Sequence, residues 1–327
     1  LERFFIYNLL SFCRKCYDTI METETSILTC RDTLHFEPCS RQIIPLLEKL
    51  FTRFPSRSCD FSLGGIFMWK EYLDYQCCFL ENTLFLKGKS PDSGCDIFYR
   101  PIGLLNEEEG IRLIREYCRN NNIKGNLLLS ETVIGKPDEI RGYDPLHYIG
   151  DWKEYLYSID SFIRFPGKKM EKKRNHYNFF ISHYEDRTIE TIGPENIDEL
   201  VTFTHWFCES HASDELLDYE SAGTIEALLD YGSFPYHGIL IRIGGRIAGF
   251  TFGEHSGDTF FVHVEKGNIE YRGIYQALAS FLAENVKARY PDVVWLNRED
   301  DTGSADLRRS KMSYHPAGFV VKRIVEI

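Results

Sequence analysis

Hydrophobic residues in the second half of the chain first follow the spacing of β-strands. Residues 238–243 and 246–252 are rich in branched and aromatic side chains, and they flank Gly244 and Gly245. Because glycine readily adopts the positive φ angles of a two-residue turn, this pattern predicts a β-hairpin. A third strand is expected at residues 259–264.

Beyond this strand the apolar spacing changes to that of a helix. Ile274, Leu278, Leu282 and Val286 would share one helix face, and Pro291 would end the helix. The same reasoning predicts the other elements of this half, which are strands at 188–192, 293–296 and 319–327 and helices at 197–208 and 305–314.

The first half of the chain repeats this order of elements. It is expected to contain a helix at 43–54, a hairpin at 77–80 and 83–86, a strand at 96–99, a helix at 107–120 and a strand at 126–129. Sequence identity between the halves is negligible, so the duplication is inferred from the order of elements alone.

This order of elements predicts a mixed α/β fold with mostly antiparallel sheets flanked by helices. We expect two similar domains at residues 31–165 and 181–327, joined by a basic connector at 166–180. The second domain would contain the reactive site, and the first would form part of its wall. Residues 1–30 are expected to be an extension outside the fold.

Composition and charge narrow the class of protein. Of the 327 residues, 43% are hydrophobic and 14% aromatic, which indicates a globular chain with a large core. The formal net charge of -11 disfavours a protein that coats nucleic acid or anionic membrane through its overall field. An anionic partner would have to be bound by a local basic patch.

No apolar run approaches the roughly 18 residues of a membrane-spanning helix. The longest, residues 4–12, is interrupted by Asn8 and Ser11. Arg14 and Lys15 follow this run, whereas the basic residues of a signal peptide precede it. We therefore expect a cytoplasmic protein.

The chain has 10 cysteines, which in that compartment would stay reduced. Cys13 and Cys16 have part of the spacing of a zinc site, but no second close pair follows them. No metal site is predicted, and the role of these two cysteines is left open.

Six basic residues and a single acid, Glu171, lie between Arg164 and Arg174. Lysines four residues apart, such as Lys168 with Lys172, would share a helix face and could hold phosphate, with a bidentate contact from Arg174. Asn175 and His176 at the end of this run could orient a ligand or cap the structure. The alternative is a solvated connector.

Three adjacent acids follow the expected strand at 293–296, at the sheet edge where α/β proteins commonly expose functional groups. They are Glu299, Asp300 and Asp301, and they require cations nearby. A substrate amine could supply the charge, or the turn could be held by Arg298, Arg308 and Lys311. In the first case Glu299 or Asp300, with a raised pKa, could accept the proton of an acceptor amine.

A hairpin, a third strand and a glycine-bearing turn that opens a long helix resemble the core of GNAT acyltransferases. In that fold the start of the helix binds the pyrophosphate of the acyl carrier. Arg272 and Gly273 stand at the matching turn. Tyr275 and Gln276 stand where usual GNAT enzymes have small residues, which counts against acetyl-CoA binding in the usual mode.

Two longer motifs, at residues 167–176 and 297–316, are similar to the phosphatidylglycerol lysyltransferase C-terminal domain family. Tyr148, Asp151, Trp152 and Tyr155 fit the same pattern, and the resemblance covers residues 33–327. It implies tandem GNAT-like domains related to enzymes that move an aminoacyl group from transfer RNA to a lipid head group.

The resemblance implies a phosphate-bearing donor, either aminoacyl-tRNA or acyl-CoA, as co-substrate. The acceptor would be a lipid head group or a small amine. Residues expected to bind substrate or phosphate are Lys168, Lys172, Arg174, Asn175, His176, Arg272, Gly273, Asn297, Arg298, Arg308 and Lys311. No resident cofactor is predicted, and the oligomeric state is left open.

Tyr314 is the candidate proton donor to the leaving group, because many GNAT enzymes have a tyrosine after the corresponding helix. Leu307, Lys311 and Tyr314 fall at helical spacing, and Pro316 would end that helix. A packed tyrosine with a hydrogen-bonded hydroxyl is the alternative. Two rival functions also stay open, namely a non-catalytic binding module on a GNAT scaffold and ordinary N-acetylation of a small amine.

Overall fold

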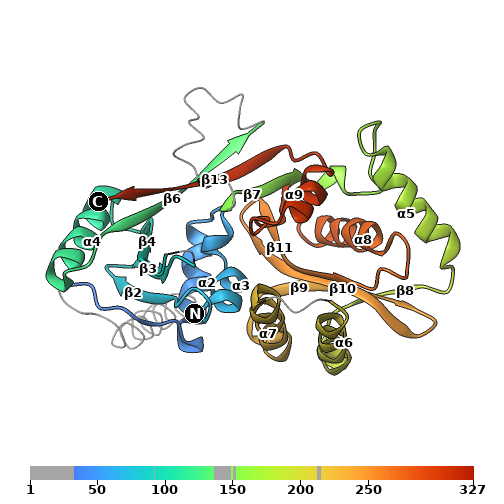
Figure 1. The fold of residues 1–327 in the computed structure, drawn as a ribbon, viewed down its shortest axis with the longest axis horizontal. Helices are drawn as coiled ribbons and strands as arrows, with labels where there is room; N and C mark the ends of the chain where they lie inside the picture. Colours follow the sequence, from blue (N-terminus) through green and yellow to red (C-terminus); the bar gives the residue numbers. More distant parts are fainter. Residues whose placement is uncertain (1–32, 92, 136–148, 150–151, 212–214) are drawn as a thin grey trace, which may run out of the picture.

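The computed structural model describes residues 33–91, 93–135, 149, 152–211 and 215–327 (Figure 1). The expected extension at 1–30, with Cys13 and Cys16, lies outside the described residues, as do Tyr148 and Asp151. None of the described helices is both long and apolar enough to cross a lipid bilayer.

The described strands form one mixed sheet that runs along the molecule (Figure 1). Its strands are β1 (Glu37–Pro38), β2 (Gln76–Leu80), β3 (Thr83–Lys89), β4 (Asp96–Tyr99), β5 (Ile102–Gly103), β6 (Asn126–Ile134), β7 (Glu154–Ser158), β8 (Thr188–Thr191), β9 (Tyr236–Ile243), β10 (Arg246–Ser256), β11 (Thr259–Gly267), β12 (Trp295–Asn297) and β13 (Gly318–Glu326). The order across the sheet is β1-β2-β3-β4-β6-β13-β7-β12-β11-β10-β9-β8, and β5 pairs with β3.

Helices cover both faces of this sheet. They are α2 (Ile44–Arg53), α3 (Leu63–Trp69), α4 (Glu107–Asn121), α5 (Glu171–His183), α6 (Ile197–Glu209), α7 (Glu215–Leu229), α8 (Ile274–Arg289) and α9 (Ala305–Met312). In the second half, α8 packs on one face of β9 to β11, and α6 and α7 lie on the other (Figure 1).

The order of elements confirms the predicted duplication. Each half has a hairpin and a third strand, then a long helix and a strand parallel to the third one. The two sets are β2-β3-β4-α4-β6 and β9-β10-β11-α8-β12, and their parallel pairs are β4 with β6 and β11 with β12. The predicted mixed α/β fold is confirmed.

The two central strands are exchanged between the halves. β7 follows β6 in sequence but pairs with β12, while β13 follows β12 but pairs with β6 along its whole length. β7 and β13 pair with each other at the centre of the sheet. Each half therefore completes the sheet of the other, and the division into domains at residues 165 and 181 stays a prediction.

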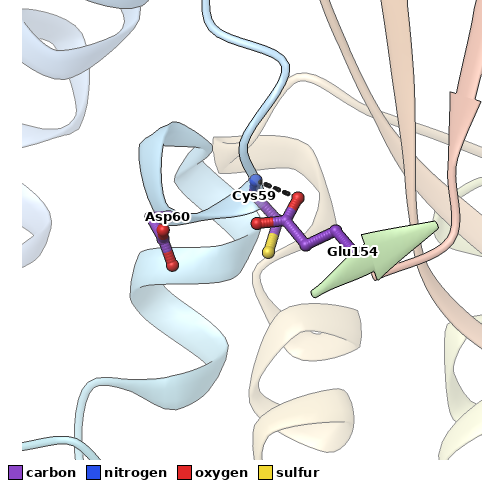
Figure 2. Close-up of side chains that lie close together, drawn as sticks. All are labelled: Cys59, Asp60 and Glu154. Atoms are coloured by element: carbon purple, nitrogen blue, oxygen red, sulfur yellow. Dashed lines mark hydrogen bonds between the residues drawn. The ribbon is translucent and has the colours of Figure 1, made fainter. Parts of the chain in front are cut away.

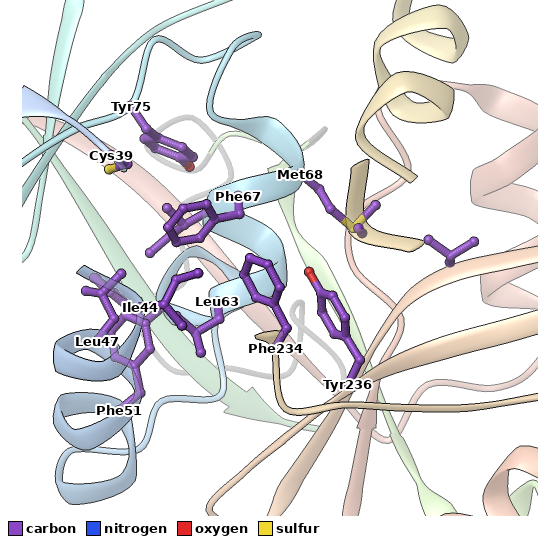
Figure 3. Close-up of a cluster of buried hydrophobic side chains, with 14 of the residues drawn as sticks. Cys39, Ile44, Leu47, Phe51, Leu63, Phe67, Met68, Tyr75, Phe234 and Tyr236 are labelled. Atoms are coloured by element: carbon purple, nitrogen blue, oxygen red, sulfur yellow. The ribbon is translucent and has the colours of Figure 1, made fainter. Parts of the chain in front are cut away.

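The largest hydrophobic cluster also joins the halves. Phe67 and Met68 of α3 pack near Phe234, which precedes β9, and Tyr236, which is the first residue of β9 (Figure 3). Helix α7, which was not predicted, packs against α3. Its buried residues form no apolar stripe, because most of them are small or polar. They are Ser221, Gly223, Thr224 and Ala227, together with the larger Leu228.

Gly223 sets the distance between α7 and α3. A Cβ atom at this position would lie 2.5 Å from the carbonyl oxygen of Met68. Gly223→Ala should therefore destabilise the fold by about 1–3 kcal/mol, although alanine favours helix formation. Urea unfolding would measure this. Gly232→Ala is the matched control, because no atom lies within 4 Å of the added Cβ, and an equal effect of the two changes would contradict the prediction.

Candidate active site

Strands β11 and β12 diverge at the place where the site begins. They pair from Thr259 with Trp295 to Phe261 with Asn297. β12 then ends, while β11 continues to Gly267. The chain after β12 is therefore free to place polar side chains beside the end of β11.

A β-bulge at His263 directs this side chain into a buried ion cluster. Val262 pairs with Gly253 and Val264 with Phe252, so His263 is the extra residue. Its Nδ1 lies 2.7 Å from Glu299 and its Nε2 lies 3.2 Å from Glu254. Burial acts to lower the pKa of His263, but the two carboxylates outweigh it and raise the pKa to about 9.

Asn297 shapes the turn that follows β12. It is fully buried, and its Oδ1 accepts a hydrogen bond from the backbone N–H of Glu299 at 2.8 Å. Its amide donates to the carbonyl of Arg57 at 2.7 Å and to the carboxylate of Glu154. Asn297 was predicted to bind substrate, and the structure uses all of these polar atoms inside the fold.

Arg308 and Lys311 also hold this turn. The guanidinium of Arg308 binds Asp301 in bidentate fashion, at 2.9 and 2.7 Å, and Tyr155 donates its hydroxyl to the same carboxylate. Lys311 Nζ donates to the carbonyl of Arg298 at 2.6 Å and to that of Asp300. Of the cations expected near the three acids, Arg308 therefore pairs with Asp301, while Lys311 binds the backbone of the turn.

Asp300 is the acid of this turn whose carboxylate has no ion-pair partner among the described residues. It is partly exposed and accepts a hydrogen bond from the backbone N–H of Thr302 at 2.9 Å. Burial raises its pKa to about 6. A recessed carboxylate with this pKa can accept a proton near neutral pH.

Tyr314 lies at the centre of a second cluster. Its ring stacks on Phe162 with centroids 5.2 Å apart, and Gln276 donates its amide to the hydroxyl at 2.8 Å. Arg298 lies 5.0 Å from the ring centroid, and Lys173 Nζ lies 3.7 Å from it. The structure therefore brings together two predicted residues, Tyr314 and Arg298, and adds Lys173.

The charges of this cluster do not balance when Lys173 is protonated. Arg298 pairs with Glu265 at 2.6 Å, and burial raises the pKa of Glu265. Burial and the nearby Arg298 lower the pKa of Lys173 to about 8. Two cations thus face one carboxylate around Tyr314, an arrangement that suits an anionic or partly negative ligand.

The start of α8 is covered by α5. A Cβ atom on Gly273 would lie 2.4 Å from the carbonyl oxygen of His176, and Arg272 lies 4.4 Å from the ring centroid of Phe179. Both contacts are made by α5 residues. The structure thus places a protein segment against the turn where a GNAT enzyme would bind its carrier.

The basic residues between Arg164 and Arg174 fall into three groups with different contacts in the structure. Arg174 donates to the carbonyls of Phe165 and Gly167, and Arg164 pairs with Glu284. Exposed positions are occupied by Lys168, Lys169, Lys172, Asn175 and His176. Lys173 alone contacts Tyr314.

The predicted helix face of Lys168 and Lys172 does not form. Helix α5 begins at Glu171, so Lys168 lies in the turn before it. Backbone φ is positive at Arg164, Phe165 and Gly167, so the chain directly before Lys168 is not helical.

Cys59, Asp60 and Glu154 form the one described group of residues with potential metal-binding atoms close together, within 4.8 Å of one another (Figure 2). Lys322 of β13 already donates to Asp60 at 2.7 Å and to Glu154 at 2.8 Å. The ammonium group thus occupies the place of a cation, and this cluster fits a buried ion network better than a metal centre.

A family model described as phosphatidylglycerol lysyltransferase, C-terminal, matches residues 51–322. The chain belongs to this family. The family and the fold support a general function in acyl or aminoacyl transfer, in agreement with the resemblance seen in the sequence.

Solved structures of this lysyltransferase family share the fold. The C-terminal domain of a protein described as a lysylphosphatidylglycerol synthetase from Agrobacterium fabrum aligns with a TM-score of 0.57 at 13% identity, over 87% of this chain and 92% of the other. L-PGS from Bacillus licheniformis aligns with a TM-score of 0.54 at 15% identity, over 88% and 92%.

Two further relatives have no described function. A conserved protein from Bacteroides thetaiotaomicron aligns with a TM-score of 0.78 at 23% identity, over 90% of this chain and 100% of the other. An uncharacterised protein of Mycoplasmoides gallisepticum is 30% identical over 175 residues, which are 52% of this chain and 54% of that protein. The chain thus spans about half the length of this curated relative.

Sequence reasoning missed the buried charges that connect the two halves of the chain. They are Asp60, Glu154, Glu254, His263 and Lys322. A signal was present, because Glu254 continues the alternation of Phe250 and Phe252 in β10, and Lys322 directly follows the apolar residues 319–321 of β13. A charge at such a position needs a buried partner.

His263→Gln should change how the free energy of unfolding depends on pH, because it removes the charge of the histidine at the β-bulge. A histidine with pKa about 9 in the fold and about 6.5 when unfolded stabilises fully below pH 6.5, and this contribution is lost as the pH rises through 9. The variant should lose about 2–3 kcal/mol of unfolding free energy at pH 6 and much less at pH 10. Denaturant unfolding at both pH values checks this.

The control for this measurement is His205→Gln on α6, where the histidine is exposed. A loss at His263 that is the same at pH 6 and pH 10 would show that packing, and not charge, explains it.

Proposed function

We propose that the chain transfers an activated acyl or aminoacyl group to an amine or hydroxyl acceptor, and that the reaction takes place beside Tyr314. Family membership and fold support the general class of reaction. The observation that carries the proposal is the cluster of the buried Tyr314 with the partly exposed Arg298, Glu265 and Lys173 at the divergence of β11 and β12.

Asp300 is the proton acceptor of this proposal. The acceptor nucleophile attacks the acyl carbon and loses a proton, which a carboxylate with pKa about 6 can take near neutral pH. Glu299 is the weaker candidate, because it is bound to His263 at 2.7 Å. That contact makes Glu299 a positioning residue for the turn.

Tyr314 is the proton donor. As the bond between the acyl carbon and its carrier breaks, the leaving oxygen or sulfur needs a proton, and the Tyr314 hydroxyl can give one. Gln276 fixes the hydroxyl through a hydrogen bond of 2.8 Å, and Arg298 can stabilise the negative charge that develops.

Aminoacyl-tRNA fits the donor role better than acyl-CoA. Helix α5 covers the start of α8, so Arg272 and Gly273 do not offer the usual pyrophosphate site. Lys168 and Lys172 are exposed on the neighbouring segment and can meet phosphates of a large carrier. A lipid head group or a small amine is the proposed acceptor, and a cytoplasmic location stays a prediction.

Tyr314→Phe tests the proton donor. Phenylalanine keeps the stacking on Phe162 but removes the hydroxyl, so transfer should fall about a hundredfold or more. The assay combines lysine-charged transfer RNA or acetyl-CoA with phosphatidylglycerol vesicles or small amines and detects products by mass spectrometry. Tyr157→Phe is the matched control, because its hydroxyl donates to the carbonyl of Lys311 nearby.

Equal losses in the two tyrosine variants would assign Tyr314 a purely structural role. If the unmodified protein gives no product with any donor, but transfer RNA or vesicles raise its melting temperature, the non-catalytic binding module is favoured. Product from acetyl-CoA alone would favour the ordinary N-acetyltransferase.

Asp300→Asn should separate catalysis from stability. The raised pKa means that ionising Asp300 costs folding energy, so its cost appears as the pH rises from about 4 through 6. The variant should match the unmodified protein near pH 4 and gain about 2 kcal/mol at pH 8, while transfer activity is lost. Asp306→Asn on exposed α9 is the control, and a gain that does not depend on pH would refute the assignment.

A further inference from the structure

Lys173 differs from every other basic residue between positions 164 and 174. Arg164 and Arg174 are engaged by a carboxylate and by backbone carbonyls, and the remaining lysines, Lys168, Lys169 and Lys172, are exposed. Lys173 is partly buried, with Nζ 3.7 Å from the ring centroid of Tyr314. In the described part of the chain, no carboxylate lies within ion-pair distance of this amine.

The position of this amine matches that of an acceptor. The proposed proton donor, Tyr314, faces the leaving group, and the acyl carbon is one bond from that group. Lys173 Nζ lies over the Tyr314 ring, 3.7 Å from its centroid, so an acyl group whose leaving atom contacts the Tyr314 hydroxyl would have its carbon near this amine. We propose that Lys173 is a modification site, whose side-chain amine accepts an acyl group from an activated ester or thioester in preference to the exposed lysines next to it.

The step needs no additional reactant. The neutral amine of Lys173 attacks the acyl carbon, an amide bond forms, and the carbon–oxygen or carbon–sulfur bond to the carrier breaks. The proton released from nitrogen replaces the one that the leaving oxygen or sulfur takes up, with Tyr314 between them. No group is oxidised or reduced, and one positive charge of the cluster is removed.

The surroundings of Lys173 favour the neutral, reactive form of the amine. Burial disfavours the charged amine most, and Arg298 also repels a second positive charge, while Glu265, which is bound to Arg298, favours that charge less strongly. With a pKa of about 8, about one amine in ten is neutral at pH 7. An ordinary exposed lysine is neutral in only about one molecule in three thousand.

A labelling experiment tests this site without requiring the transfer reaction. The full chain is treated with a trace of acetic anhydride at pH 7, digested with a protease that does not cleave at lysine, and analysed by mass spectrometry. We expect at least a tenfold higher labelling of Lys173 than of Lys168, Lys169 or Lys172. Labelling that is equal to or below that of the exposed lysines would overturn the inference.

Two controls show whether the fold causes this difference. In the urea-unfolded chain the four lysines should be labelled equally. Lys173→Arg should remove the dominant label from the folded chain, whereas Lys172→Arg should leave it. A dominant label that persists in the unfolded chain would also overturn the inference.

The enzymatic form of the modification rests on the proposed function and is tested by replacing the anhydride with acetyl-CoA or lysine-charged transfer RNA. Acylation of Lys173 by either donor supports the inference. Transfer to an external acceptor with Lys173 unlabelled overturns it and leaves the proposed function standing. If the anhydride selects Lys173 but neither donor reacts, the reactive lysine stands and the proposed function fails.

Discussion

The buried ammonium of Lys322 is the constraint on which the rest of the structure depends. A buried lysine requires paired carboxylates, and it has two, Asp60 and Glu154, which lie on different segments of the first half. Glu154 also accepts a hydrogen bond from Asn297, and Asn297 in turn fixes the backbone of Glu299. Because Lys322 lies on the exchanged strand β13, the seam between the halves and the turn beside the candidate site belong to one hydrogen-bonded network.

Local patterns were sufficient to predict most elements, because hydrophobic period and turn glycines act over a few residues. The hairpin around Gly244, helix α8 and the parallel strand after it all follow from such patterns. The exchange of β7 and β13 could not be predicted, since it depends on pairing between residues more than 130 positions apart in the sequence, such as Leu156 with Asn297. Helix α7 was missed because its close contact with α3 selects small residues and not an apolar stripe.

Candidate site residues were found in the correct segments, but their roles could not be separated from the sequence. Glu299, Asp300 and Asp301 are chemically alike and adjacent, yet a turn with positive φ at Glu299 sends them in different directions. The Glu299 carboxylate pairs with His263, and the Asp301 carboxylate pairs with Arg308. Asp300 has no ion-pair partner among the described residues. Adjacent residues in a turn do not share a periodicity that would reveal this.

The departure from the usual GNAT turn has a structural reason in α5. Tyr275 packs in the hydrophobic cluster that contains Phe180 of α5, and Gln276 donates to the Tyr314 hydroxyl. Both side chains that seemed to obstruct a carrier therefore have partners within the fold. If transfer takes place at Tyr314, the carrier must reach it without the start of α8, because α5 occupies that position. Lys173 also lies on α5. The helix that covers the usual carrier site therefore also adds a basic side chain to the proposed site at Tyr314.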